Sequence, residues 1–165
     1  MLILVEVPFG DPRVQELVAE VQAHYVVIYG TPDESPVDPR EFAPPRGRFV
    51  LGVDDVDGVE EPAAMGGWRW RPELDVRFGG DLVAEVKRMF VPARMRGKGH
   101  ARDVLAFLER TAYADGVERL VLETGLMQPD AMGLYESAGY EPVVPFGHYA
   151  QSELVKCYGK DLRRD

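Results

Sequence analysis

The chemically most informative stretch of the sequence is Arg96-Gly-Lys-Gly-His-Ala-Arg102, which we call the glycine loop and which lies between a predicted strand and a predicted helix. Unpaired amides and the positive dipole end at a helix start bind anions, and glycines let the backbone come close to a phosphate. The loop does not match the nucleoside-triphosphate pattern, since no Ser or Thr follows Gly97-Lys98. It does not match the dinucleotide pattern either, since Arg102 stands where the third glycine belongs. We therefore expect a phosphate-bearing ligand of another kind.

A third pattern fits this loop. Arg96-x-x-Gly99-x-Ala101 resembles the pyrophosphate loop, Gln/Arg-x-x-Gly-x-Gly/Ala, of the GNAT superfamily of acyl-CoA N-acyltransferases. An offset match, Arg94-x-x-Gly97-x-Gly99, also exists. The later register is preferred because it keeps the usual four residues between the strand end at Val91 and the arginine.

Two further segments carry the resemblance, and together the three span roughly residues 82 to 144. Residues 84–91 are similar to the central strand of the family. Residues 128–140, Gln-Pro-Asp-Ala-Met-Gly-Leu-Tyr-Glu-Ser-Ala-Gly-Tyr, are similar to its helix pattern Asn-x-x-Ala-x-x-Leu-Tyr-x-x-x-Gly-Phe. Gln128 departs from the asparagine that makes a polar contact to CoA in the family.

The resemblance implies that acetyl-CoA is the co-substrate and that no metal takes part. Acyl-CoA would lie between the strand ending at Val91 and the strand ending near Thr124. Backbone amides of the first strand would bind the pantetheine and the thioester carbonyl, and amides of the glycine loop would bind the pyrophosphate. The implied cofactor-binding residues are Met89, Phe90, Val91, Arg96, Gly97, Lys98, Gly99, His100, Ala101, Arg102, Gln128 and Tyr135.

Acyl transfer to a primary amine needs a base, because such amines are mostly protonated at neutral pH. Glu85, six residues before Val91, occupies a position where several members of the family place a catalytic glutamate. Strand alternation predicts residues 85, 87, 89 and 91 on one face. A glutamate paired with an arginine is the structural interpretation of Glu85. Glu123, at the end of the next predicted strand, and water are the other candidate bases.

Tyr135 is the predicted acid. Its match to the Leu-Tyr pair of the family implies that its hydroxyl reaches the sulfur of the leaving group. A thiol has a pKa near ~8.5 and a phenol near ~10, so the phenol can donate a hydrogen bond or a proton to the thiolate. The alternative is a core aromatic residue on an apolar helix face.

The elements around these motifs alternate between strands and helices. Strands are predicted over residues 2–7, 49–53, 63–71, 82–91, 120–122, 140–144 and 154–158, and helices from residue 12, over 102–114 and from 129. This order predicts one α/β domain over residues 1–165. The GNAT resemblance implies a mixed, mostly antiparallel central sheet with helices on both faces. Residues 30–47 form a Pro-rich loop, expected to be a lid or disordered.

Composition narrows the class of protein. Apolar residues make up 45% of the 165 residues, enough for a core, and a net charge of −9 argues against a nucleic-acid partner. The single cysteine, Cys157, excludes an internal disulfide and fits a reducing compartment. The longest uncharged stretch, residues 21–32, falls short of the ~20 apolar residues of a membrane span. We therefore predict a cytoplasmic protein without a membrane partner, and leave homodimer formation open.

The sequence thus predicts an acyl-CoA-dependent enzyme that moves an acetyl group to a primary amine of a small molecule, by direct transfer in a ternary complex. A protein N-terminus or a lysine side chain is the alternative acceptor, and would need an open groove where residues 30–47 are expected to fold over. A non-catalytic acyl-CoA sensor is the alternative of another class, and the presence of Tyr135 favours the enzyme. The acidic net charge favours a cationic acceptor through long-range attraction.

Overall fold

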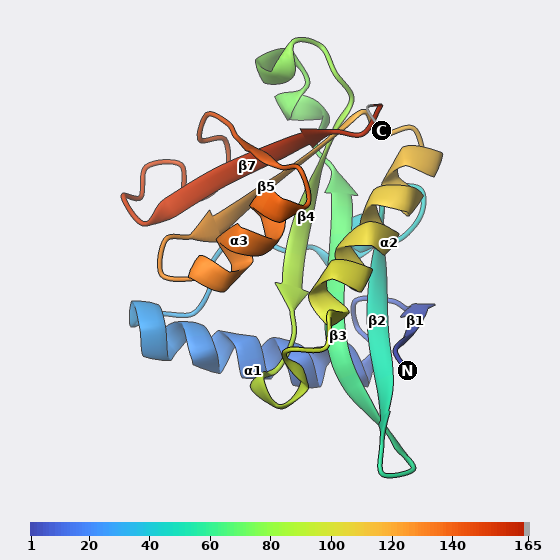
Figure 1. The fold of residues 1–165 in the computed structure, drawn as a ribbon. Coiled ribbons are helices and arrows are strands. Elements are labelled where there is room, and N and C mark those ends of the chain that lie inside the picture. Colours follow the sequence, from blue (N-terminus) through green and yellow to red (C-terminus); the bar gives the residue numbers. More distant parts are fainter. Residues whose placement is uncertain (164–165) are drawn as a thin grey trace.

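The computed structural model describes residues 1–163 and contains a seven-stranded sheet in the order β1-β2-β3-β4-β5-β7-β6 (Figure 1). The strands are β1 Ile3–Glu6, β2 Gly47–Val56, β3 Val59–Trp70, β4 Val83–Phe90, β5 Arg119–Gly125, β6 Glu141–Pro142 and β7 Val155–Asp161, and the helices are α1 Pro12–Tyr29, α2 His100–Ala114 and α3 Pro129–Ser137. All neighbouring strands are antiparallel except β4 and β5. The predicted α/β class, the element order and the mixed sheet are confirmed.

The helices cover both faces of the sheet, as Figure 1 shows, because successive strand residues point to opposite faces. In β2, Val50 packs into the core beneath α2 and α3, whereas Phe49 and Leu51 pack into the core against α1. The apolar stripe of α2 consists of Val104, Leu105, Leu108 and Ala112. The stripe of α1 consists of Val14, Leu17 and Val21. The spacing that predicted these helices is therefore the spacing that buries them.

The central strands separate partway along their length. β4 and β5 pair only over three residues each, where Val83–Glu85 lies beside Arg119–Val121. Beyond Glu85, β4 continues beside β3, while β5 follows β7 as far as Gly125. Figure 1 shows the two strands diverging toward α1. Beyond this point, backbone hydrogen bonds no longer join the facing edges of β4 and β5.

A β-bulge in β4 corrects the predicted alternation. Met65 pairs with Phe90 and Gly67 with Lys87, so two β4 residues lie opposite one β3 residue. Arg88, in the bulge, has a φ of 60°, in the left-handed region that non-glycine residues rarely adopt. Residues 85 and 87 share one face as predicted, but Met89 and Val91 pack into the core beneath α2 and α3. The extra residue reverses the side-chain direction of every residue after it.

The segment from residue 30 to residue 47 is ordered against the α1 face of the sheet. It contains a short 3₁₀ helix, Pro39–Phe42, and the Phe42 ring is buried in the core against α1. Ser35 in the same segment is also buried. Among residues 1–163, no helix combines the length and the apolar character needed to cross a membrane.

Candidate functional site

The glycine loop has the strand–loop–helix arrangement expected for an anion site. Gly97 and Gly99 each have a φ of 81°, a backbone conformation that favours glycine. A Cβ atom at either glycine would meet no protein atom within 4 Å, so the space above the loop is open. Gly99 is the N-cap of α2, and no side chain caps this helix start. The first amides of α2 therefore remain available to an anion.

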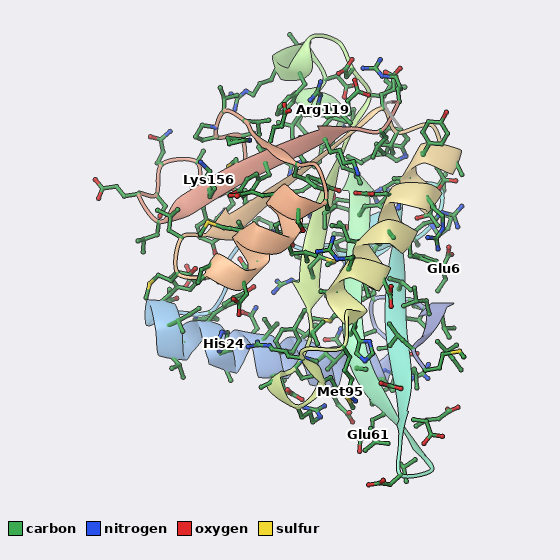
Figure 2. All side chains as sticks on the ribbon, in the orientation of Figure 1. Glu6, His24, Glu61, Met95, Arg119 and Lys156 are labelled. Carbon is green, nitrogen blue, oxygen red and sulfur yellow. The ribbon has the colours of Figure 1, made fainter. Side chains whose placement is uncertain are left out.

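Contacts to neighbouring elements hold the loop in place. Figure 2 labels Met95 in the turn between β4 and α2, where its side chain is buried. Arg94 binds Glu20 of α1 at 2.8 Å, and the Arg96 Nε donates to the carbonyl of Val91 at 3.1 Å. These contacts anchor both ends of the turn that precedes the loop.

His100 is placed differently from the other residues of the glycine loop. Its side chain is buried, and Nε2 lies 3.0 Å from Asp54 Oδ2. Its Nδ1 has no hydrogen-bond partner among the described residues. The imidazole thus points into the protein, and only the backbone amide of His100 is in position to contribute to the predicted anion site.

Tyr135 lies on the inner side of α3. Its ring packs against Tyr140 and Tyr158, at centroid distances of 5.8 and 6.3 Å. Burial raises the pKa of the Tyr135 phenol well above its ordinary value, so the hydroxyl keeps its proton at neutral pH. Within residues 1–163 no side chain or backbone group forms a hydrogen bond with this hydroxyl.

Two other predicted CoA contacts are engaged within the protein. The Gln128 Oε1 accepts from the Tyr29 hydroxyl at 3.3 Å and from the Gly125 amide at 3.2 Å. Gln128 thereby links β5, α1 and the start of α3. The Arg102 Nη2 donates to Ser137 Oγ at 2.8 Å and joins α2 to α3. The Gln128 amide nitrogen and the other N–H donors of Arg102 form none of these contacts and stay available to a ligand.

Two adjacent cavities open on the α1 face beside the divergence. The first cavity, of about 240 Å³, is lined by Tyr25, Tyr29 and Tyr149, and the second, of about 340 Å³, by Arg69 and Arg71 among others. Lys87 of β4 and Glu123 of β5 line both cavities. The segment 30–47 contributes to the walls of each, as expected for a lid. His148 also lines the second cavity.

Glu85 is the centre of an ion-pair network. It is 1% exposed, and its Oε1 accepts from Arg69 Nε and Nη2 at 3.3 and 3.1 Å and also from Arg71 Nη1. Arg69 continues to Glu41 and to the carbonyl of Pro36, so the network ties the segment 30–47 to β3 and β4. These are the contacts that the structural interpretation of Glu85 expects.

Glu123 has a different environment. Its Oε2 accepts from the Tyr149 amide at 3.1 Å, whereas its buried Oε1 has no hydrogen-bond partner in the described part of the chain. Burial raises the pKa of the Glu123 carboxyl, and the nearby charge of Glu85 raises it further. A carboxylate with a raised pKa and a free lone pair is suited to accept a proton.

A hydrogen-bond chain crosses the cavities. The Lys87 Nζ donates to Ser35 Oγ at 2.8 Å, and Ser35 Oγ donates to Asp33 Oδ1 at 2.7 Å. The Tyr149 hydroxyl donates to the same Asp33 oxygen at 2.7 Å. Burial alone would raise the pKa of Asp33. The Lys87 charge and the hydrogen bonds from Ser35 outweigh burial and hold this pKa below its usual value. Arg88, with a side chain only 7% exposed, lies 3.6 Å from the other Asp33 oxygen.

The sequence analysis missed most of these cavity residues. Asp33 and Tyr149 are 116 residues apart and belong to no recognisable motif. Glu85 and Glu123 were candidates from the start, and Lys87 was placed on the face of Glu85 by its position two residues later.

Comparisons with known proteins agree with the geometry. The sequence profile described as "Acetyltransferase (GNAT) family" matches residues 14–140. The chain is 41% identical over 157 residues to an IAA acetyltransferase of Azospirillum brasilense, covering 95% of each chain. Its fold is similar to a putative acyl-CoA N-acyltransferase from Klebsiella pneumoniae, with a TM-score of 0.77, 23% identity and 98% of each chain covered. It is also similar to Arabidopsis thaliana NAA60, solved with acetyl-CoA, with a TM-score of 0.66, 12% identity and 99% of each chain covered.

Proposed function

The chain belongs to the GNAT family of acetyltransferases, and from this premise we propose that it transfers an acetyl group from acetyl-CoA to the primary amine of a small molecule. Both substrates are bound together, and the carbon–nitrogen bond forms as the carbon–sulfur bond breaks. One observation carries the proposal: Glu123, with an unpaired carboxylate oxygen, lies where β4 and β5 diverge and lines both cavities.

The residues along the divergence fit acetyl-CoA, which supplies the activated acyl carbon. The backbone of Met89, Phe90 and Val91 follows the point where β4 loses β5 as a partner, and would bind the pantetheine and the thioester carbonyl. Donors held in place around that oxygen would stabilise the charge that develops on it. The amides from Gly97 to Arg102 would bind the pyrophosphate at the start of α2.

Glu123 is the base in this proposal. An alkylamine has a pKa near ~10.4 and must lose a proton before it attacks. The proton moves from the amine nitrogen to the Glu123 carboxylate, which lines both cavities and has one oxygen without a partner among the described residues. Glu85 remains the alternative base, but three N–H groups of Arg69 and Arg71 already converge on its Oε1.

Tyr135 is the acid. The thiolate that leaves needs a proton or a hydrogen bond, and the Tyr135 phenol keeps its proton because burial raises its pKa. Its hydroxyl has no competing partner among residues 1–163, which leaves the donor available. The second nitrogen proton, lost as the amide forms, replaces the proton that Tyr135 gives to the thiolate. The proton on Glu123 then passes to solvent, so that both residues return to their starting states and the reaction balances.

Acetyl-CoA titration followed by an amine panel tests the proposal. Acetyl-CoA at about 100 times its Kd should stabilise the protein by about 2.7 kcal/mol, measured as a rise in melting temperature. Gly99→Val should abolish this rise, because a side chain would stand over the pyrophosphate site. Gly79→Val is the matched control, since Gly79 also has a positive φ and open space but lies in a distant turn.

Measuring turnover distinguishes an enzyme from a non-catalytic acyl-CoA sensor. Release of CoA thiol with at least one primary amine supports the proposal. A protein that binds acetyl-CoA but acetylates no amine is a sensor, and an unchanged acetyl-CoA affinity in folded Gly99→Val contradicts the proposed loop.

A further inference from the structure

The charges that line the two cavities are unevenly paired. Arg69 is bound by Glu85 and Glu41, and Arg71 is bound by Glu73 and Glu85. These guanidinium groups are neutralised within the protein. Lys87 and Glu123, the two charged residues that line both cavities, are not paired in this way.

Lys87 is a buried cation with donors to spare. It is 9% exposed, and among residues 1–163 no carboxylate oxygen lies within 4.0 Å of its ammonium group. Asp33 and Glu123 feel its charge from a greater distance. Its one hydrogen bond goes to the neutral Ser35 hydroxyl, although an ammonium group has three N–H donors. Buried charges are ordinarily paired, so Lys87 has capacity for an anion.

Glu123 is the complement of Lys87. Its Oε1 is a buried acceptor without a donor in the described part of the chain. Leaving such an acceptor unpaired is costly, and an ammonium or amine group is the donor that would satisfy it best. A ligand that spans both residues would therefore carry a nitrogen donor and an anionic group close together.

We propose that the acceptor is a free α-amino acid, with its amine at Glu123 and its carboxylate at Lys87. The inference rests on the proposed function and narrows its substrate class. A carboxylate would receive charge-assisted hydrogen bonds from the two unused N–H groups of Lys87. A peptide N-terminus offers an uncharged amide at the corresponding position, and would leave Lys87 unpaired.

The walls of the first cavity suit the remainder of such a molecule. Tyr25, Tyr29 and Leu154 line this cavity together with Lys87 and offer mostly apolar surface to a side chain. Asp33 is occupied by Ser35, Tyr149 and Arg88, which leaves Glu123 as the acid that can hold the amine.

Matched acceptors test the inference on the native enzyme. Each of the twenty amino acids is offered as the free acid and as its primary carboxamide, which keeps the amine and the shape but removes the negative charge. We expect the best free acid to be acetylated with a kcat/KM at least tenfold above that of its carboxamide. Carboxamides that react as well as the free acids overturn the inference, leave the proposed function intact and point to peptide termini. Failure of every amino acid in both forms, with turnover of another primary amine of the panel, also overturns the inference, whereas failure of the whole amine panel contradicts the proposed function itself.

Lys87 variants test the recognition directly. Lys87→Met should raise KM for the free acid at least tenfold and leave the carboxamide unchanged, whereas Lys87→Arg should keep the preference. Ser35→Ala removes the hydrogen-bond partner of Lys87 but not its charge, and should keep the preference as well. If Ser35→Ala reproduces the loss seen in Lys87→Met, Lys87 acts by holding the segment 30–47, and the inference is wrong. Should Lys87→Met not fold, the comparison of free acids with carboxamides decides alone.

Discussion

Two glutamates on neighbouring strands of one sheet face have opposite surroundings. Glu85 lies at the last pair of the β4–β5 ladder, opposite Val121, and holds two arginines. Glu123 lies two residues beyond that pair, where the strands have begun to diverge, and has one oxygen without a partner. The same residue type thus has two different environments at nearby positions of one sheet.

The two glutamates differ because different groups reach their carboxylates. Where the strands pair, β3 passes close to β4 and brings Arg69 and Arg71 to Glu85, so its charge is balanced inside the protein. Where the strands diverge, β4 no longer lies beside Glu123, and β7, which pairs Cys157 with Glu123, brings no cation to its carboxylate among residues 1–163. A carboxylate whose charge two guanidinium groups balance stabilises the fold, and one without such a counter-charge is available to a substrate. Four predictions test this distinction, in order of decreasing effect on turnover.

Glu123→Gln should have the largest effect. Removing a general base lowers kcat by about 10²–10⁴, and the amide of glutamine cannot accept the amine proton. Steady-state kinetics with a saturating amine measures this, and acetyl-CoA binding should stay near normal. A kcat within threefold of the wild type would exclude Glu123 as the base and would break the comparison.

Tyr135→Phe should reduce kcat roughly 10-fold or more, because the variant loses only the hydroxyl that serves the leaving thiolate. The ring contacts with Tyr140 and Tyr158 persist, so the melting temperature and the acetyl-CoA affinity should hardly change. A variant that turns over the amine at the wild-type rate would return Tyr135 to a packing role.

The pH dependence of kcat should reflect the titration of Glu123. Because the folded protein raises the pKa of this carboxyl, kcat should fall on acidification at a higher pH than an ordinary glutamate would give. The acidic limb should disappear in Glu123→Gln.

The raised pKa of Glu123 also makes protein stability depend on pH. The folded state binds the proton more tightly than the unfolded state does, so the free energy of unfolding decreases as pH rises through the raised pKa. Glu123→Gln should therefore be at least as stable as the wild type at neutral pH.

Glu85→Gln should change kcat by less than threefold and instead lower the free energy of unfolding by about 1–3 kcal/mol, because two largely buried guanidinium groups each lose one of their two carboxylate partners. Denaturant unfolding measures the loss, and Glu123→Gln is its matched control on the next strand. A fall of 10²-fold or more in kcat with unchanged stability would make Glu85 the base, as its position in the strand first suggested.

Much of the fold was predictable from local patterns. The stripes of α1 and α2, the short apolar strand at residues 120–122 and the turn at the glycine loop all follow from residues close in sequence. The bulge at Arg88 was not predictable, because an arginine in the left-handed region is held there by its neighbours and not by its own preference. The consequence was local, and it reversed the predicted directions of Met89 and Val91.

The sequence by itself determined the turn at the glycine loop and the uncapped start of α2, because the conformational freedom of Gly97 and Gly99 and the amides of a helix start are local properties. It also identified Glu85, Glu123 and water as the alternatives for the base. Only the tertiary structure decided between their surroundings. The arginines of Glu85 and the Tyr149 amide at Glu123 come from elsewhere in the chain. Burial and donor supply depend on which strands lie side by side, and the spacing of residues along one strand cannot encode that.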